Sequence, residues 1–222
     1  MSDKTNSNTV VECLALHYVK VQRPDNYGKY AADLIITKAT KQSLEKKYAN
    51  LKRKFVALDA DDYLAKYKME SPLPDAIVYL MKMDIEHSIT FKDKKSGETK
   101  TIQKSRPKVL LQGADGTATD ITLSRLVGNG SKGKVVLLHR ESTSADYGST
   151  DKLSLGNILI TELVEYVGGS GGGGSPEFEG SDPTDDFGLT SITVEAPSAA
   201  ALAAQAAASD APPFDTVDDE EY

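Results

Sequence analysis

VVECLALHYVKVQ, residues 10–22, is dominated by β-branched and apolar side chains. This composition is typical of a strand, and RPDN at residues 23–26 follows it with turn chemistry. A second apolar run, KYAADLIIT at residues 29–37, begins directly after Gly28. We therefore expect two consecutive strands joined by a tight turn, which mark the start of a mainly β fold.

The next segment has the periodicity of helices. In TKQSLEKKYANLKRKF, residues 40–55, four apolar residues recur on one helical face: Leu44, Tyr48, Leu51 and Phe55. We expect an amphipathic helix that packs on the sheet, with Tyr48, Phe55 and the later Tyr79 in the core. The aspartates of residues 59–62 are suited to cap a short second helix.

From Tyr79 onward the sequence consists of short strand signals separated by glycine or polar turns. The strand signals lie at residues 83–93, 107–112, 133–141 and 152–167, and turns are expected at 94–100 and 113–120. About five strands with an intervening helix suit a small barrel. For residues 1–167 the pattern favours the oligonucleotide-binding (OB) fold, a five-stranded barrel that accepts an inserted helix.

Charge divides the chain at GGSGGGGSPEFEGSD, residues 168–182, which we expect to be a glycine-rich linker; an engineered junction of the GGGGS type would look the same. All 26 Lys and Arg residues precede it, whereas 12 of the 33 Asp and Glu residues lie in 169–222. The net charge of −7 thus combines a basic body with an acidic tail. Residues 183–222 have few large apolar side chains, so we expect them to be disordered.

Most enzyme classes lack support in this sequence. His17, His87 and His139 are scattered, and the body has neither metal-ligand spacing nor a Walker-type phosphate loop. We expect a non-catalytic protein without a cofactor or metal. The single cysteine, Cys13, lies in an apolar run and is expected to be an inert core thiol in a reducing cytoplasm. Neither a membrane span nor a secretory leader is indicated.

Four segments, in this order, carry a resemblance to a known family: HYVKVQRPDNYGKYAADLIIT (17–37), FKDKKSGETKTIQ (91–103), GNGSKGKVVLL (128–138) and NILITELVEYVGG (157–169). Together with the acidic tail they resemble the single-stranded DNA-binding proteins of short-tailed phages of the T-seven type. The resemblance implies an OB fold, binding of single-stranded DNA, strand annealing and a homodimer. Two departures stand out: the chain ends in Tyr222 where relatives end in phenylalanine, and residues 140–142 are RES where aromatic residues are expected.

Single-stranded DNA is held by cations that contact phosphates and by aromatic faces that stack on bases. The expected cationic contacts are Arg23, Lys29, Lys92, Lys94, Lys95, Lys100, Lys104, Arg106, Lys108, Lys132, Lys134, Arg140 and Lys152. The expected stacking residues are Tyr27, Tyr30 and Tyr147. The alternatives are that each lysine is a solvated surface charge, that Tyr30 is a core residue and that Tyr27 is an ordinary turn residue.

The resemblance also implies that the tail recruits the phage DNA polymerase and helicase-primase. The residues expected to dock are Phe214, Asp215, Asp218, Asp219, Glu220, Glu221 and Tyr222. A coat protein of this kind would serve DNA replication, recombination and repair in the cytoplasm of the bacterial host. The competing interpretation is an OB-like adaptor that binds protein partners and uses its tail for solubility only.

Overall fold

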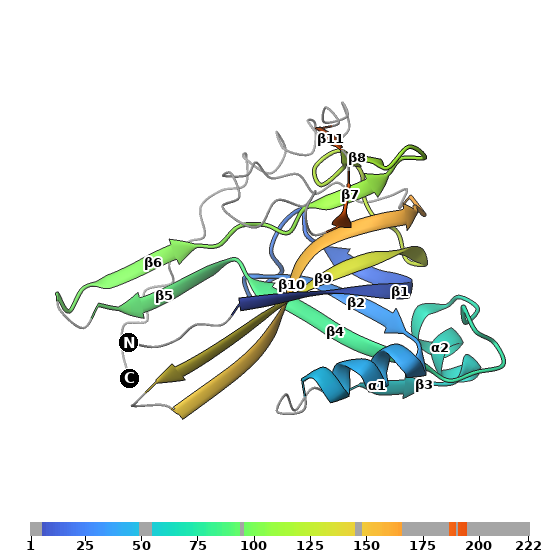
Figure 1. Cartoon of the computed structure of the whole chain (residues 1–222), viewed down its shortest axis with the longest axis horizontal. Coiled ribbons are helices and arrows are strands. Elements are labelled where there is room, and N and C mark those ends of the chain that lie inside the picture. The colour runs from blue at the N-terminus through green and yellow to red at the C-terminus, as the bar shows by residue number, and fades with distance from the viewer. Residues whose placement is uncertain are drawn as a thin grey trace, which may run out of the picture.

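A computed structural model describes residues 6–48, 55–93, 96–144, 148–165, 187–189 and 191–194 of the chain. The fold is mainly β, as the sequence predicts (Figure 1). The strands are β1 (Asn6–Lys20), β2 (Lys29–Ile36), β3 (Val56–Leu58), β4 (Val78–Glu86), β5 (Ser88–Lys92), β6 (Thr99–Gln103), β7 (Val109–Gln112), β8 (Thr117–Asp120), β9 (Ser131–Ser144), β10 (Gly148–Glu162) and β11 (Ser191–Val194). The helices are α1 (Lys38–Lys47) and α2 (Ala60–Tyr67).

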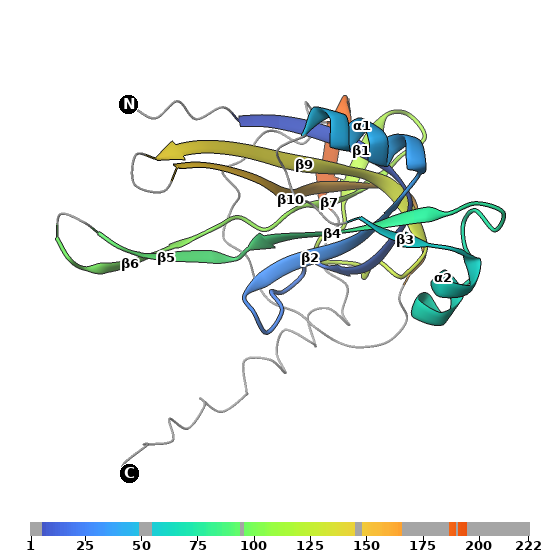
Figure 2. The same cartoon turned by 90° about the horizontal axis from the view of Figure 1, so that it is seen from below.

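Five antiparallel strands form the body of the main sheet, in the order β10-β9-β1-β2-β4. The outer two of these strands, β10 and β4, also contact each other. The sheet therefore curls back on itself, as the expected five-stranded barrel requires (Figure 1, Figure 2). Among the described residues no ladder joins β4 to β10, so the barrel meets at this seam without strand pairing.

The sheet has more strands than the five expected. Beyond β10 it continues through β7, β8 and β11, beyond β4 it continues through β3, and β5 and β6 form a separate two-stranded ribbon. Residues 113–120 were expected to be only a turn, yet Gly116 turns the chain at φ +80° and Thr117–Asp120 pairs back onto β7. The short threonine-rich strand was missed because its turn signals are stronger than its apolar pattern.

One strand lies within the range that we expected to be a disordered tail. β11 pairs in parallel with β8, and just before it Phe187 and Leu189 pack on a buried cluster of Leu110, Ala118 and Leu159. For these residues the structure differs from the expectation, because two large apolar side chains find an apolar surface and β8 offers an open edge. The other residues of the predicted tail lie outside the described residues.

The first strand changes partners along its length. β1 pairs with β9 from Asn6 to Cys13 and, after a register shift, again at Leu16. It pairs with β2 from Ala15 onward, and its register with β2 shifts between His17 and Lys20. Within this shift lies Tyr18, whose φ of +49° is in the left-handed region. Such a β-bulge bends the strand, so that one continuous segment lines two sides of the barrel.

Both helices begin with an N-cap residue, of which only the aspartate cap of α2 was expected from the sequence. The Thr37 hydroxyl accepts a hydrogen bond from the N–H of Thr40 at 3.1 Å at the start of α1. At the start of α2, Asp59 Oδ1 accepts one from the N–H of Asp62 at 2.8 Å, which confirms the predicted aspartate cap. α1 ends at Lys47, whereas the helix was expected to reach residue 55; residues 49–54, which include Leu51, lie outside the described residues.

The core lies inside the curled sheet and continues under the helices. Tyr48 is buried as expected, and Phe55 and Tyr79 are partly buried against the same core. Cys13 is also in this core, with 3% of its surface exposed, and its burial raises the pKa of the thiol above its ordinary value. The thiol therefore stays protonated and unreactive, as the sequence predicts.

Candidate nucleic-acid interface

A row of charged side chains covers the outer side of β1, β2 and β4. Because side chains alternate along a strand, every second residue of β2 and β4 points away from the core. Ladder pairs on this outer side are Lys29 with Glu86 and Asp33 with Lys82. Ala32, which precedes Asp33 in β2, points to the other side and is buried. The surface, called the β2–β4 face below, consists of Lys20, Lys29, Ala31, Asp33, Lys82, Asp84 and Glu86.

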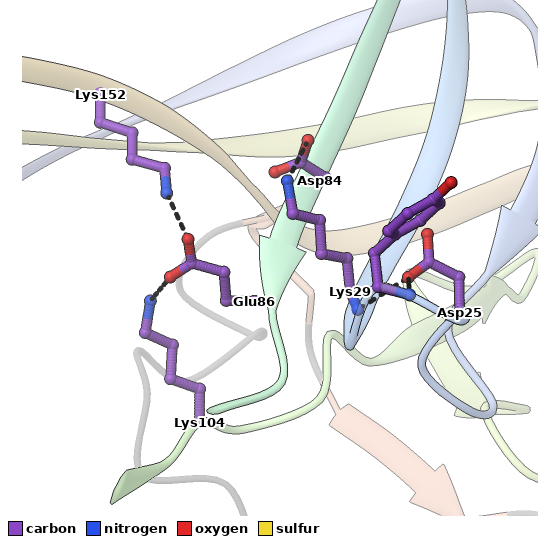
Figure 3. A network of polar contacts seen from close by, with 7 residues as sticks. Asp25, Lys29, Asp84, Glu86, Lys104 and Lys152 are labelled. Atoms are coloured by element: carbon purple, nitrogen blue, oxygen red, sulfur yellow. Dashed lines mark hydrogen bonds and ion pairs between the residues drawn. The ribbon is translucent and has the colours of Figure 1, made fainter. Parts of the chain in front are cut away.

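Glu86 gathers lysines from two other segments at one end of this face (Figure 3). Its carboxylate oxygens accept hydrogen bonds from Lys104 Nζ at 3.4 Å and from Lys152 Nζ at 3.3 Å. Burial raises the pKa of Glu86, but the hydrogen bonds and charges of Lys152 and Lys104 outweigh it and hold the pKa below its ordinary value. The carboxylate thus occupies a position that cations from β10 and from the segment after β6 surround.

A third cation belongs to this cluster. Arg140 of β9 is the direct ladder partner of Lys152 of β10 and is exposed. Directly opposed residues of neighbouring strands point to the same side of a sheet. The group of Glu86, Lys104, Arg140 and Lys152, called the charge cluster below, therefore has three cations and one anion, a surplus that suits an anionic ligand.

The turn between β1 and β2 presents a ring beside this cluster. Asp25 Oδ1 accepts hydrogen bonds from the N–H groups of Tyr27 at 2.9 Å and Lys29 at 3.0 Å, and Gly28 completes the turn at φ +68°. Tyr27 is 86% exposed. A cavity of about 630 Å³ lies beside the turn, lined by Arg23 and Tyr27 among others. The turn thus holds an aromatic face in the solvent next to a hollow.

Tyr30, the other expected stacking residue of this segment, is a core residue. Only 2% of its surface is exposed, and its hydroxyl and His87 Nδ1 lie 3.0 Å apart in a hydrogen bond. The expectation that Tyr30 stacks on a base is wrong for this conformation, and the alternative of a core residue is correct. Strand alternation explains the difference, since Tyr30 points inward at the position after Lys29.

Arg106 also differs from its expected role. It is 9% exposed, and its guanidinium carbon lies 5.9 Å from the centre of the Tyr30 ring. This geometry is that of a cation–π contact in a buried setting. Arg106 therefore packs against Tyr30 below the surface and has little exposed area with which to contact a phosphate.

The β5–β6 ribbon projects from the body (Figure 1, Figure 2). Its base is tied to the β1–β2 turn, because His87 N–H donates to the Gly28 carbonyl at 2.7 Å and Lys104 N–H donates to the His87 carbonyl at 2.6 Å. On the ribbon Lys92 is exposed, and Lys100 forms an ion pair with Asp93 at 2.6 Å. The ribbon thus carries cations away from the charge cluster.

The remaining predicted cations do not join the cluster. Lys132 forms an ion pair with Glu162 at 2.8 Å, near the opposite end of β9 from Arg140. Lys134 and Lys108 are half-buried, and the Lys108 N–H donates to Asn157 Oδ1 at 3.0 Å. Lys94, Lys95, Tyr147 and residues 214–222 lie outside the described residues. The structure therefore brings together only part of the predicted set.

Sequence reasoning missed several residues of the face. Lys20, Lys82 and the acidic partners Asp33 and Asp84 were not selected. Alternation in residues 78–86 was a usable signal for Lys82, since its neighbours Met81 and Met83 are buried. No sequence signal marks the bulge at Tyr18.

The described part of the chain holds no group of three or more His, Cys, Asp or Glu side chains placed to bind a metal ion. Within the same ranges, no helix has the length and apolar character needed to cross a membrane.

No family model matches the chain, and no curated protein matches it. Among solved structures, the chain is similar to gp2.5, a single-stranded DNA-binding protein encoded by bacteriophage T7, at 22% identity and a TM-score of 0.37, over 76% of this chain and 91% of that one. It is also similar to the single-stranded DNA-binding protein from bacteriophage Enc34, at 15% identity and a TM-score of 0.36, over 81% and 88%. A C-terminal truncation of the Enc34 protein is similar at 14% identity and a TM-score of 0.37, over 71% of this chain and 87% of that one. All three are structures of single-stranded DNA-binding proteins of bacteriophages.

Proposed function

We propose that the chain is a non-catalytic protein that binds single-stranded DNA along the β2–β4 face. The observation that carries the proposal is the charge cluster beside the exposed ring of Tyr27. Phosphates need cations, and unpaired bases need exposed aromatic faces on which to stack. Lys104 and Lys152 both contact the Glu86 carboxylate, Arg140 is the ladder partner of Lys152, and Tyr27 is 86% exposed at the adjoining turn.

In this proposal a phosphate takes the place that Glu86 occupies in the free protein. Lys104 and Lys152 exchange one anionic oxygen partner for another, so the gain in Coulomb energy is offset by the lost ion pairs with Glu86. Binding is then weak at each contact and strongly dependent on salt, because displaced counterions return to solution. Such a surface suits a protein that coats DNA and must also leave it.

We propose that the whole chain has three parts. Residues 1–167 form the binding domain, residues 168–182 form a linker, and residues 183–222 form an acidic segment that competes with DNA for the cations. Its last residues, 214–222, recruit the phage DNA polymerase and helicase-primase. The protein acts as a homodimer in the cytoplasm of the bacterial host, where it protects single strands and anneals complementary ones during replication, recombination and repair.

The test is a fluorescence-anisotropy titration of labelled oligo-dT, repeated with duplex DNA of equal length at several salt concentrations. We expect preference for the single strand and a linear fall of log affinity with log salt concentration. A matched control is Lys46→Ala, which removes an exposed lysine of α1 and should leave binding unchanged. Absence of binding at low salt, in the full chain and with residues 214–222 removed, would refute the proposal.

One observation favours the competing function of a protein-binding adaptor. The β5–β6 ribbon exposes Phe91 and Ile102, at 41% and 57%. Exposed apolar side chains on a projecting ribbon are typical of contact with another protein. In that case Phe91→Ser would have the same affinity for oligo-dT as the wild type, and a protein partner would bind with little dependence on salt.

A further inference from the structure

The bulge in β1 forces a large aromatic residue into a backbone conformation that such residues avoid. Tyr18 has φ +49°, and a left-handed backbone is unfavourable for every residue that carries a Cβ, above all a bulky one. Lys68, the other such residue in the described ranges, is at the C-cap of α2, where a left-handed residue is ordinary. Tyr18 has no such explanation.

The loop before β9 fixes this conformation from outside. The Tyr18 N–H donates to Asn129 Oδ1 at 2.9 Å, and the Gly130 N–H donates to the Leu16 carbonyl at 3.0 Å. Gly130 itself has φ +90°, and a Cβ there would lie 2.8 Å from Met69 Cε. Asn129 and Gly130 therefore hold the bulge through hydrogen bonds, and these contacts maintain the unfavourable backbone conformation of Tyr18.

The Tyr18 ring is half in the solvent and half on an aromatic floor. It is 46% exposed, and its centre lies 5.8 Å from that of Tyr67 and 6.5 Å from that of His17. Those two rings are stacked at 3.8 Å with an angle of 11°. The Tyr67 hydroxyl donates to Asp33 Oδ2 at 3.2 Å, and His17 Nε2 and Tyr63 Oη are hydrogen-bonded at 2.6 Å. The two rings beside Tyr18 are therefore held in place by hydrogen bonds and by stacking on each other.

Cations lie near Tyr67 and Asp33, next to the Tyr18 ring. Lys66 Nζ is 5.5 Å from the centre of the Tyr67 ring. Lys82, Lys66 and Lys20 all act electrostatically on Asp33, the acceptor of the Tyr67 hydroxyl. Lys82 and Asp33 are ladder partners on the β2–β4 face. The Tyr18 ring therefore stands at the α2 end of the face, as Tyr27 stands at the other.

We propose that Tyr18 is a base-stacking residue, held in a left-handed bulge so that a single-stranded nucleic acid on the β2–β4 face stacks one base on its ring. The inference rests on the proposed function and adds a second stacking position to it. Lys29 and Asp33 are four residues apart on β2, which separates the two ends of the face by about 13 Å. The strand would thus run along β2, with phosphates on the cations between the two rings.

The decisive variant is Tyr18→Gly, which removes the ring and also relieves the backbone, because glycine accepts a positive φ. We expect affinity for oligo-dT to fall about tenfold with an unchanged salt slope, since stacking involves no counterions. The melting temperature should not fall. Tyr18→Phe keeps the ring and should retain the affinity of the wild type.

A direct readout uses the absence of tryptophan from the chain. In Tyr18→Trp the single indole should lose emission when oligo-dT is added, because it stacks on a base. The matched control is Val56→Trp on β3, a position that is 48% exposed, and its emission should not change. Adding Asn129→Ala to Tyr18→Trp removes the acceptor of the bulge N–H and should weaken the quenching, because Asn129 no longer holds the bulge that positions the ring.

Three results would overturn the inference. If Tyr18→Gly binds oligo-dT as the wild type does and Tyr18→Trp shows no quenching, Tyr18 does not stack, although the proposed function stands. If the wild type itself fails to bind single strands, the proposed function fails and this inference fails with it. A fall in melting temperature of Tyr18→Gly that accounts for its weaker binding would make the ring structural only.

Discussion

The two ends of the β2–β4 face differ in what they offer a ligand and in how they are held. At one end the charge cluster consists of side chains that hold one another through ion pairs of 3.3 and 3.4 Å. At the other end His17, Tyr18 and Tyr67 form an aromatic group on a buried hydrogen-bonded base. The charge cluster depends on ion pairs and is sensitive to salt, whereas the aromatic group depends on ring contacts and is insensitive to salt. Affinity and selectivity for unpaired bases can therefore be changed separately.

The largest effect expected is a loss of folding stability in acid, caused by His17 in the aromatic group. Burial lowers the pKa of His17 to about 4, against about 6.5 in an unfolded chain. Between these values the unfolded chain binds more protons, so stability is full above pH 6.5 and falls toward pH 4, by about 3 kcal/mol. Urea unfolding at a series of pH values should show this loss in the wild type.

The control for this prediction is His17→Asn, which removes the titrating ring. Its stability at neutral pH is expected to be lower, because the contacts with Tyr63 and Tyr67 are lost. The additional loss between neutral and mildly acidic pH should be absent. An equal acid-induced loss in both proteins would show that other groups cause it.

The next largest effect should come from the charge cluster. In the double variant Lys104→Ala with Lys152→Ala, two phosphate contacts are lost at about 1 kcal/mol each, so affinity for oligo-dT should fall about thirtyfold at low salt. The slope of log affinity against log salt should become shallower by about 1.4. Lys38→Ala with Lys46→Ala on α1 removes the same charge from exposed positions and serves as the control. An unchanged slope in the double variant would place the phosphates elsewhere.

A smaller effect is expected for the ring beside the cluster. Tyr27→Ala should weaken binding about tenfold, because one stacking contact is lost. The salt slope should stay that of the wild type, which distinguishes this change from removal of a lysine. Tyr27→Phe should bind normally. If Tyr27→Ala binds as tightly as the wild type, the alternative of an ordinary turn residue is correct.

The smallest effect expected is a gain. Glu86→Gln removes the anion that competes with phosphate, so binding should tighten about threefold at low salt and be unchanged at high salt. The lysines hold the pKa of Glu86 below its ordinary value, so the carboxylate stays charged until the pH falls below the usual range of glutamic acid. The advantage of the variant over the wild type should therefore persist through mild acid and disappear below that range. Weaker binding by Glu86→Gln would mean that the carboxylate positions the lysines.

Local chemistry made part of this arrangement predictable. The strands at residues 10–22 and 29–37, the turn between them and the Asp59 cap follow from composition and spacing alone. The sequence did not reveal which way Tyr27 and Tyr30 point, because alternation does not tell which side of β2 is buried and does not extend to Tyr27 in the turn. Arg106 was predicted to bind phosphate because a sequence shows charge and not burial.

Features that depend on contacts between distant segments were missed. The bulge at Tyr18 exists because Asn129 and Gly130, more than a hundred residues later, hold it. β11 forms because β8 offers an open edge beside Leu110 and Ala118. Neither interaction leaves a periodic pattern in the segment that it shapes, so local propensity gives no sign of it.

Cys13, buried where β1 pairs with β9, is a built-in probe of the opening of this part of the barrel. It is the single cysteine of the chain, so a thiol reagent can modify the protein only when this strand opens. The rate of labelling then measures the opening of the barrel in unmodified protein, without any introduced probe. A ligand that binds only the closed barrel lowers that rate in proportion to its occupancy. Labelling in the presence of oligonucleotides therefore ranks their affinities from the protein's own chemistry.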